Sequence, residues 1–156
     1  AGPPVLDGKQ GKKLTVIFEA RPGVTAVAPT PAQVAACKAP QCARITFVYK
    51  PAKGVKSPLT VTERNFWAGL GDEDIYLMQG TKVIASCTGT MSNKRYLSVP
   101  PSALKPGTTY SAVMFISHEI GESTSMNVEL PGSSAPPQYS LDPNKPFDYS
   151  VTMCGV

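Results

Sequence analysis

Metal-binding and membrane-spanning features are scarce in this chain of 156 residues. It contains one histidine, His118, and its four cysteines form no Cys-x-x-Cys pair. Because zinc sites in proteins draw most of their ligands from cysteine and histidine, this composition argues against zinc. No run approaches the ~20 apolar residues that a membrane-spanning helix needs, so we do not expect the chain to span a membrane.

Motifs that identify common enzyme classes are missing as well. The sequence has no nucleophile elbow, no phosphate-binding loop and no paired metal-ligand motif. The best candidate for acid–base chemistry is the run Ser117-His118-Glu119, with Ser123 nearby. Neighbours on an extended strand point to opposite faces, which places Ser117 and His118 poorly for proton transfer. We therefore expect a non-catalytic protein that needs no cofactor.

The charge of the chain is modest and dispersed. Fifteen Lys and Arg residues against eleven Asp and Glu residues give a net charge of +4. The basic residues form groups of two or three without interleaved aromatic residues, so nucleic-acid binding is not expected. Weak attraction to anionic envelope polymers fits the same charge. The only acidic cluster, residues 72–74, is expected to be a solvated turn rather than a calcium site.

Proline and glycine are abundant, with 16 and 13 copies. They separate short runs of β-branched and aromatic residues, a pattern typical of an all-β sandwich or barrel. One short helix is expected over 31–37, with Thr30 as its N-cap and Pro31 as its first residue. The predicted strands cover residues 14–20, 44–49, 59–62, 75–78, 82–87, 95–99, 109–116, 125–130 and 148–153.

These signals predict an antiparallel β-sandwich with Pro/Gly-rich loops. Residues 1–13, rich in Gly, Pro and Lys, are expected to be a flexible N-terminal lead-in. Residues 14–156 are expected to form a single domain, since a chain of this length supports one core.

The even number of cysteines in a small β-rich chain favours disulfides over free thiols. Cys37 and Cys42 are close enough to close a small loop, which leaves Cys87 and Cys154 to connect a central strand to the last one. Four cysteines allow three connectivities, of which this one is favoured. Disulfides imply an oxidising compartment, so we expect a secreted, periplasmic or cell-surface protein.

The segment 102–113, Ser-Ala-Leu-Lys-Pro-Gly-Thr-Thr-Tyr-Ser-Ala-Val, resembles a signature of immunoglobulin-like and fibronectin type III-like domains. In that signature a Pro-Gly turn leads into a central strand, Leu104 closes one end of the core, and Tyr110 bonds back to the backbone as a tyrosine corner. The resemblance extends over residues 45–115, which look like the bacterial immunoglobulin-like domains of exported and cell-surface proteins.

That resemblance implies an immunoglobulin-like fold and says little about function. Domains of this family usually act as spacers, adhesive units or accessory modules beside an enzyme. The small periplasmic copper carriers share the architecture, but this chain lacks an N-terminal histidine and His118 stands alone. No copper site is therefore implied.

Phe66, Trp67 and Tyr76 are the candidate binding residues. An exposed aromatic platform is a common way for β-sandwiches to bind sugars or partner chains. The alternative is that Trp67 fills the core, as the single tryptophan of immunoglobulin-like folds often does.

We expect the protein to be a binding or structural module that engages a protein partner in an envelope or surface assembly. The alternative is a carbohydrate-binding module that uses the platform around Trp67 to bind a cell-envelope polysaccharide. The sequence fixes neither the partner nor the oligomeric state.

Overall fold

The computed structural model describes most of the chain. The residues it describes are 2–9, 13–19, 29–39, 41–65, 72–89, 94–118, 123–131 and 151–155. Within them the fold is mostly β, with one α-helix and one short 3₁₀ turn, η1 (Pro101–Ala103). The all-β prediction is confirmed.

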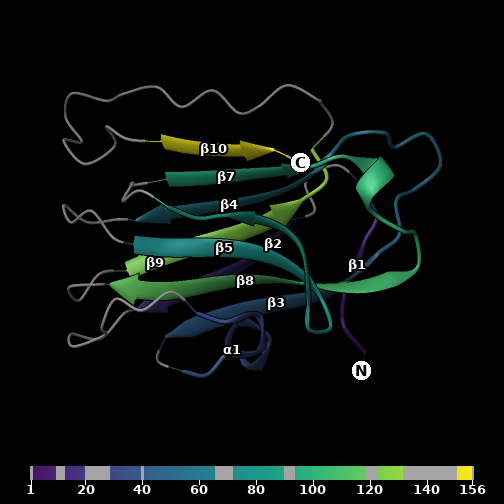
Figure 1. The fold of residues 1–156 in the computed structure, drawn as a ribbon. Helices are drawn as coiled ribbons and strands as arrows, with labels where there is room; N and C mark the ends of the chain where they lie inside the picture. The colour runs from purple at the N-terminus through teal and green to yellow at the C-terminus, as the bar shows by residue number, and fades with distance from the viewer. Residues whose placement is uncertain are drawn as a thin grey trace.

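The strands form two five-stranded sheets, which we call sheet A and sheet B (Figure 1). Sheet A has the order β1 (Val5–Leu6), β3 (Cys42–Tyr49), β8 (Thr108–His118), β5 (Asp72–Gln79) and β6 (Lys82–Cys87). Sheet B has the order β10 (Val151–Gly155), β7 (Lys94–Val99), β4 (Leu59–Asn65), β9 (Ser123–Glu129) and β2 (Lys13–Glu19).

One core of buried side chains joins the two sheets. Alternate residues of each central strand point into it, as the period of two in an extended strand requires. Sheet A contributes Phe47 and Leu77, and sheet B contributes Val61, Leu97 and Met126, all essentially without solvent exposure. The sequence runs with alternating apolar residues therefore correspond to strands with one buried face.

Both sheets are mixed, so the prediction of a purely antiparallel sandwich was wrong. β1 pairs in parallel with β3, and β10 pairs in parallel with β7, whereas the other pairs are antiparallel. The two parallel strands are the first and the last along the chain. Each reaches its neighbour through a long intervening segment rather than a hairpin, so neither is constrained to run antiparallel.

The segment expected to be a lead-in contributes a strand. β1 lies along the end of β3, where the Val48 amide donates to the Pro4 carbonyl over 2.9 Å. Leu6 is fully buried in the shared core. Gly8 then turns the chain towards sheet B with a φ of +80°, a conformation that favours glycine, close against Val55.

Helix α1 (Pro31–Ala36) confirms the predicted helix and its N-cap. The Thr30 hydroxyl accepts from the Gln33 amide at 3.2 Å, and the Gln33 side chain accepts from the Thr30 amide at 2.8 Å. This reciprocal capping box satisfies two backbone donors at the helix start. At the other end Cys37 adopts a left-handed conformation with a φ of 42°, which stops the helix.

The tyrosine corner is present as predicted. The Lys105 amide donates to the Tyr110 hydroxyl at 2.9 Å, and Gly107 holds a φ of +82° in the turn between them. Leu104 is buried in the shared core. The bond connects the turn to the central strand of sheet A and satisfies a hydroxyl that would otherwise be buried without a partner.

Both predicted disulfides are formed. Cys37–Cys42 joins the end of α1 to the start of β3. Cys87–Cys154 joins β6 of sheet A to β10 of sheet B, over 67 residues of sequence. The second bridge therefore connects the edge strands of the two sheets along one side of the molecule.

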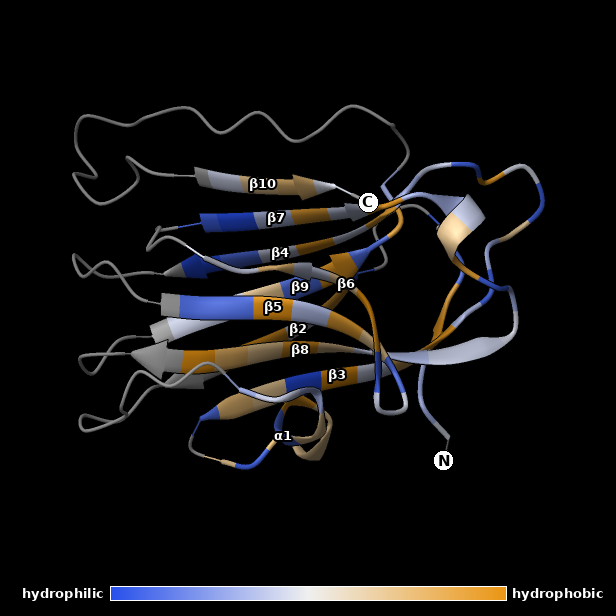
Figure 2. Ribbon diagram, viewed as in Figure 1, coloured by the Kyte–Doolittle hydropathy of each residue, from blue (hydrophilic) through white to orange (hydrophobic). Residues whose placement is uncertain are grey.

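Charged side chains are buried at one end of the molecule, where Figure 2 shows hydrophilic segments of β4, β5 and β7 together. Glu63 and Arg95 are register partners on β4 and β7, and both alternate with core residues of their strands. Glu73 has the corresponding position on β5, and all three are at most 1% exposed.

The prediction that residues 72–74 form a solvated turn was wrong. β5 begins at Asp72, so the strand period of two places Glu73 on the same inward side as Ile75. Asp74 is 7% exposed. Three consecutive acidic residues resemble a surface turn in sequence, and only the register of β5 shows that two of them are buried.

Candidate functional site

Of the three residues of the predicted aromatic platform, the structure describes only Tyr76. Phe66 and Trp67 lie outside the described residues. Tyr76 alternates with the core residues Ile75 and Leu77, so it belongs to the outer face of sheet A. There it is half-buried and packs against a second hydrophobic cluster.

That second cluster lies between sheet A and helix α1. Its buried members are Val34 from α1, Cys42 from β3, Met78 from β5, and Val113 and Phe115 from β8. Helix α1 and the Cys37–Cys42 loop therefore cover part of the outer face of sheet A, where a simple two-sheet sandwich would expose side chains to solvent.

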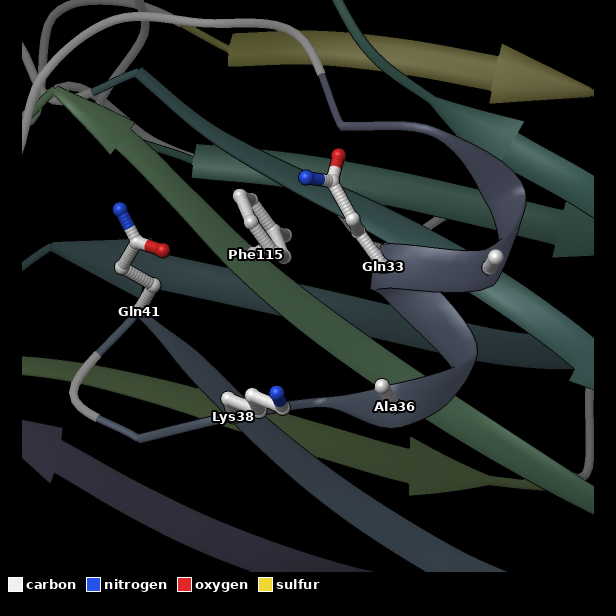
Figure 3. Close-up of a pocket in the computed structure, with 6 residues that line it drawn as sticks. Gln33, Ala36, Lys38, Gln41 and Phe115 are labelled. Atoms are coloured by element: carbon white, nitrogen blue, oxygen red, sulfur yellow. The ribbon is translucent and has the colours of Figure 1, made fainter.

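A cavity of about 290 Å³ lies beside this cover (Figure 3). Its floor is the Phe115 ring from β8, and α1 and the disulfide loop form its rim. The residues lining it are Ala32, Gln33, Ala36, Lys38, Gln41 and Phe115. A monosaccharide-sized or amino-acid-sized ligand fits a cavity of this volume.

The walls of the cavity are well anchored. The Arg44 guanidinium Nη1 donates to the Ala35 carbonyl at 3.1 Å, which fixes the last turn of α1 to β3. The Ile116 amide donates to the Gln41 carbonyl at 2.7 Å, which fixes the disulfide loop to β8. The lining combines an aromatic ring, two carboxamides and one ammonium group, so it suits a ligand with both polar and apolar surface.

Sequence reasoning missed this cavity. Gln33 lies before the Cys37–Cys42 loop and Gln41 lies within it, but nothing in the sequence brings Phe115, more than seventy residues away, beneath them. The predicted helix cap and the predicted disulfide indicate the segments that form the rim of the cavity. They do not predict that Phe115 forms its floor.

Sheet edges provide a different kind of surface, because an edge strand presents unpaired backbone donors and acceptors. Three of the four edge strands are short or interrupted. β1 has two residues and β10 has five, while β6 carries Lys82 and faces a register shift between Leu77 and Met78 of β5. Such features weaken an edge as a template for another strand.

The fourth edge strand, β2, is long and regular. Its seven residues pair with β9 without a register shift, and no described strand pairs with its other side. Leu14 and Val16 pack against the shared core, whereas Lys13, Thr15 and Ile17 are exposed on the outer face. Ile17 is 69% exposed, the largest value among the exposed large apolar residues of the described segments.

The sequence of β2 carries one of the usual protections of an edge, the exposed lysine Lys13 at its start, and lacks the others. Lys13–Glu19 reads Lys-Leu-Thr-Val-Ile-Phe-Glu, with no proline, glycine or inward-pointing charge among its described side chains. The Thr15 hydroxyl donates to the Asn127 side chain at 2.6 Å, which holds β2 against β9. The sequence predicted this strand well, but it did not show that the strand lies at an edge.

Two buried tyrosines, Tyr49 and Tyr96, lie outside both the cavity and the β2 edge. Desolvation raises the pKa of Tyr49, and the nearby Tyr110 adds to that effect. Desolvation also raises the pKa of Tyr96, while a hydrogen bond with Ser98 opposes the increase. Both phenols therefore stay protonated at neutral pH and serve as packing groups.

Within the described residues, no group of three or more His, Cys, Asp and Glu side chains is placed to hold a metal ion. No helix in these segments is long and apolar enough to cross a membrane. The chain matches no protein-family model, no curated protein and no solved structure.

Proposed function

We propose that this protein is a non-catalytic, immunoglobulin-like binding module that engages a protein partner outside the cytoplasm, in an envelope or surface assembly. The contact surface is the free side of β2, to which an extended segment of the partner adds as a further strand of sheet B. Strand addition gains affinity from backbone hydrogen bonds and specificity from alternate side chains.

The observation that carries this proposal is the combination of length, regularity and exposed apolar surface in β2. A seven-residue edge strand provides several backbone groups for pairing, and Ile17 at 69% exposure provides an apolar contact beside them. Among the described strands β1, β6 and β10 are shorter or interrupted, and residues 42–47 of β3, which β1 leaves uncovered, form an edge one residue shorter than β2.

The tyrosine corner supports the immunoglobulin-like assignment. A bond from the Lys105 amide to Tyr110, just before the long central strand β8, is the arrangement found at this corner in immunoglobulin-like domains. The shared core between two sheets agrees with it, although the parallel strands β1 and β10 are additions to the simplest form of that fold.

The compartment is inferred from the cysteines. Two disulfides are formed and no free cysteine is found among the described residues. This is consistent with an oxidising, extracytoplasmic environment, where such bonds form and persist.

Site-specific photo-crosslinking tests the proposal. A photoreactive residue is placed at Ile17 and, in a matched control, at Met153, the exposed apolar residue of β10. We expect the probe at position 17 to crosslink to one contiguous segment of a protein partner, mapped by mass spectrometry. The probe at position 153 should not reach that segment, and equal crosslinking from both positions would refute a role for the β2 edge.

A carbohydrate-binding module is the second candidate, favoured by the cavity above Phe115. Carboxamides and an ammonium group around an aromatic ring match the polar and apolar faces of a sugar. This candidate differs from the platform expected from the sequence, because its ring is Phe115 rather than Trp67.

Retention on a panel of insoluble glycans tests the second candidate and separates its two possible locations. Loss of retention in the paired variant Gln33→Ala/Gln41→Ala, with Trp67→Ala unaffected, would assign the site to the cavity. The opposite pattern would assign it to the platform around Trp67. No retention by the wild-type protein would contradict carbohydrate binding.

A further inference from the structure

We infer that the partner strand of β2 is β2 of a second copy of this chain, so that sheet B continues across a two-fold axis into the same sheet of the other copy. This inference rests on the proposed function of the β2 edge. It adds the identity of the partner and the register of the pairing.

The sequence of β2 is self-complementary when two copies run antiparallel. With Val16 opposite itself on the two-fold axis, position 13 of each copy lies opposite position 19 of the other. The sequence has a basic residue, Lys13, at the first position of β2 and an acidic residue, Glu19, at the last, so this register pairs positions of opposite charge at both ends. A two-fold interface must use the same patch on both copies, and this register satisfies that condition with opposite charges.

The middle of the strand fits the same register. Thr15 of one copy lies opposite Ile17 of the other, and both are exposed on the outer face of sheet B in the single chain. The alternation is preserved because positions 13, 15, 17 and 19 all share one face of the strand. The pairing therefore covers Ile17 without turning a core residue outward.

Alternative registers lose this complementarity. Shifting the pairing by two residues leaves Lys13 opposite Ile17 and removes the contact between opposite charges at both ends. Shifting it by one residue would place the inward side of one copy against the outward side of the other. The register centred on Val16 is the one that uses all seven residues of β2.

Sedimentation equilibrium with charge-reversed variants tests the inference. We expect the mass of the wild-type protein to increase with concentration from 16.5 kDa towards twice that value. Lys13→Glu alone or Glu19→Lys alone places like charges opposite each other twice per dimer, which should weaken association roughly tenfold. The double variant Lys13→Glu/Glu19→Lys restores the opposite charges and should recover the dimer.

The charge-reversed variants need a folding control, because Lys13 also lies opposite Glu129 on β9 within the chain. Thermal unfolding of each variant reports that internal effect. Recovery of the dimer in the double variant, which keeps the Lys13→Glu change against Glu129, separates pairing between copies from stability within one copy.

Disulfide trapping tests the register directly. In the proposed pairing, Thr15→Cys of one copy lies opposite Ile17→Cys of another, within the 4.4–6.8 Å Cα separation typical of disulfides. Two Thr15→Cys copies place their cysteines on a diagonal of about 7–8 Å, which disfavours the bond. A mixture of the two variants should therefore form crosslinked dimers faster than either variant alone.

The outcomes distinguish this inference from the proposed function. A concentration-independent mass of 16.5 kDa, with crosslinks from position 17 to a different protein, would overturn self-pairing and leave the strand-addition proposal in place. A dimer that is insensitive to the charge reversals, or that forms no mixed disulfide, would overturn the register. A monomer without crosslinks from position 17 would overturn both proposals.

Discussion

The two outer strands of sheet B differ in how they are held. β10 is short, runs parallel to β7, and is bonded through Cys154 to Cys87 in the other sheet. β2 is longer, runs antiparallel to β9, and is held by a continuous register and the bond from Thr15 to Asn127. One edge is held by a covalent bridge between the sheets, whereas the other is held by noncovalent pairing and packing.

This difference suggests a division of roles between the two sides of the molecule. A covalent bridge limits how far β10 can move from β6, and its five residues give little length for a new strand. β2 has the length and the exposed apolar surface for strand addition. The side with the bridge provides stability, and the opposite side provides the contact surface that we propose.

The largest expected effect concerns the charged interior on the β10 side of sheet B. Arg95 is fully buried on β7, opposite Glu63 on β4, whereas β9 presents Met126 inside on the β2 side. Arg95→Ala removes a buried cation from the register position opposite the buried Glu63, which should cost about 3–5 kcal/mol in the free energy of unfolding. Urea unfolding measures this, with exposed Lys53→Ala as the control; equal values would contradict a role for the buried charge.

The next largest loss in the free energy of unfolding is expected on removing the Cys87–Cys154 disulfide. Replacing Cys87 and Cys154 with alanine opens a loop of 67 residues, which the chain-entropy model values at about 4 kcal/mol. Replacing Cys37 and Cys42 opens a loop of five and should cost about 2 kcal/mol. Denaturant unfolding of the two double variants compares them, and a greater loss from the short loop would show that the bridge on the β10 side is not the main constraint.

A smaller effect is expected at Gly8, where the chain turns from β1 towards β2. A Cβ atom there would lie 2.7 Å from a methyl group of Val55, and the residue has a φ of +80°. Gly54 has a similar φ of +86° with open space around it. Gly8→Ala should therefore cost about 2–3 kcal/mol and Gly54→Ala about 1 kcal/mol.

Chemical denaturation measures both glycine variants, and Gly8→Ala combined with Val55→Ala completes the test. If the close contact with Val55 causes the difference, the second substitution should recover part of the loss in Gly8→Ala. Equal losses in Gly8→Ala and Gly54→Ala would show that the turn before β2 is not tightly packed.

The smallest effect on stability is expected from substitutions on the two edges. Ile17→Lys and Met153→Lys both place a charge on an exposed position, so each should change the free energy of unfolding by less than about 0.5 kcal/mol. Association should respond at one edge only. Sedimentation should show loss of the dimer in Ile17→Lys and no change in Met153→Lys, and the reverse result would assign the contact surface to β10.

The sequence predicted the local elements well. The N-cap at Thr30, the turn before Tyr110 and the pairing of Cys87 with Cys154 all depend on residues with specific local geometry. The cap and the turn involve residues close together in the sequence, and four cysteines allow only three connectivities. These features can therefore be predicted from the sequence.

The direction of a strand, its position in the sheet and the burial of its side chains could not be predicted from the sequence in the same way. Nothing in Val151–Gly155 specifies a parallel neighbour, and nothing in Lys13–Glu19 specifies an edge. Glu73 looked like part of a surface turn, although register makes it a buried residue. These properties depend on which strands become neighbours, which is a property of the whole fold.

Hydrogen exchange at single-residue resolution, measured across a dilution series, tests the central claim most directly. The amides of β2 alternate between pointing towards β9 and pointing away from it. We expect the alternate amides that point away to gain protection as concentration increases, while the amides of β10 keep the same exchange rates. Unchanged exchange along β2 over the whole series, or concentration-dependent protection of β10 instead, would contradict the assignment of β2 as the pairing edge.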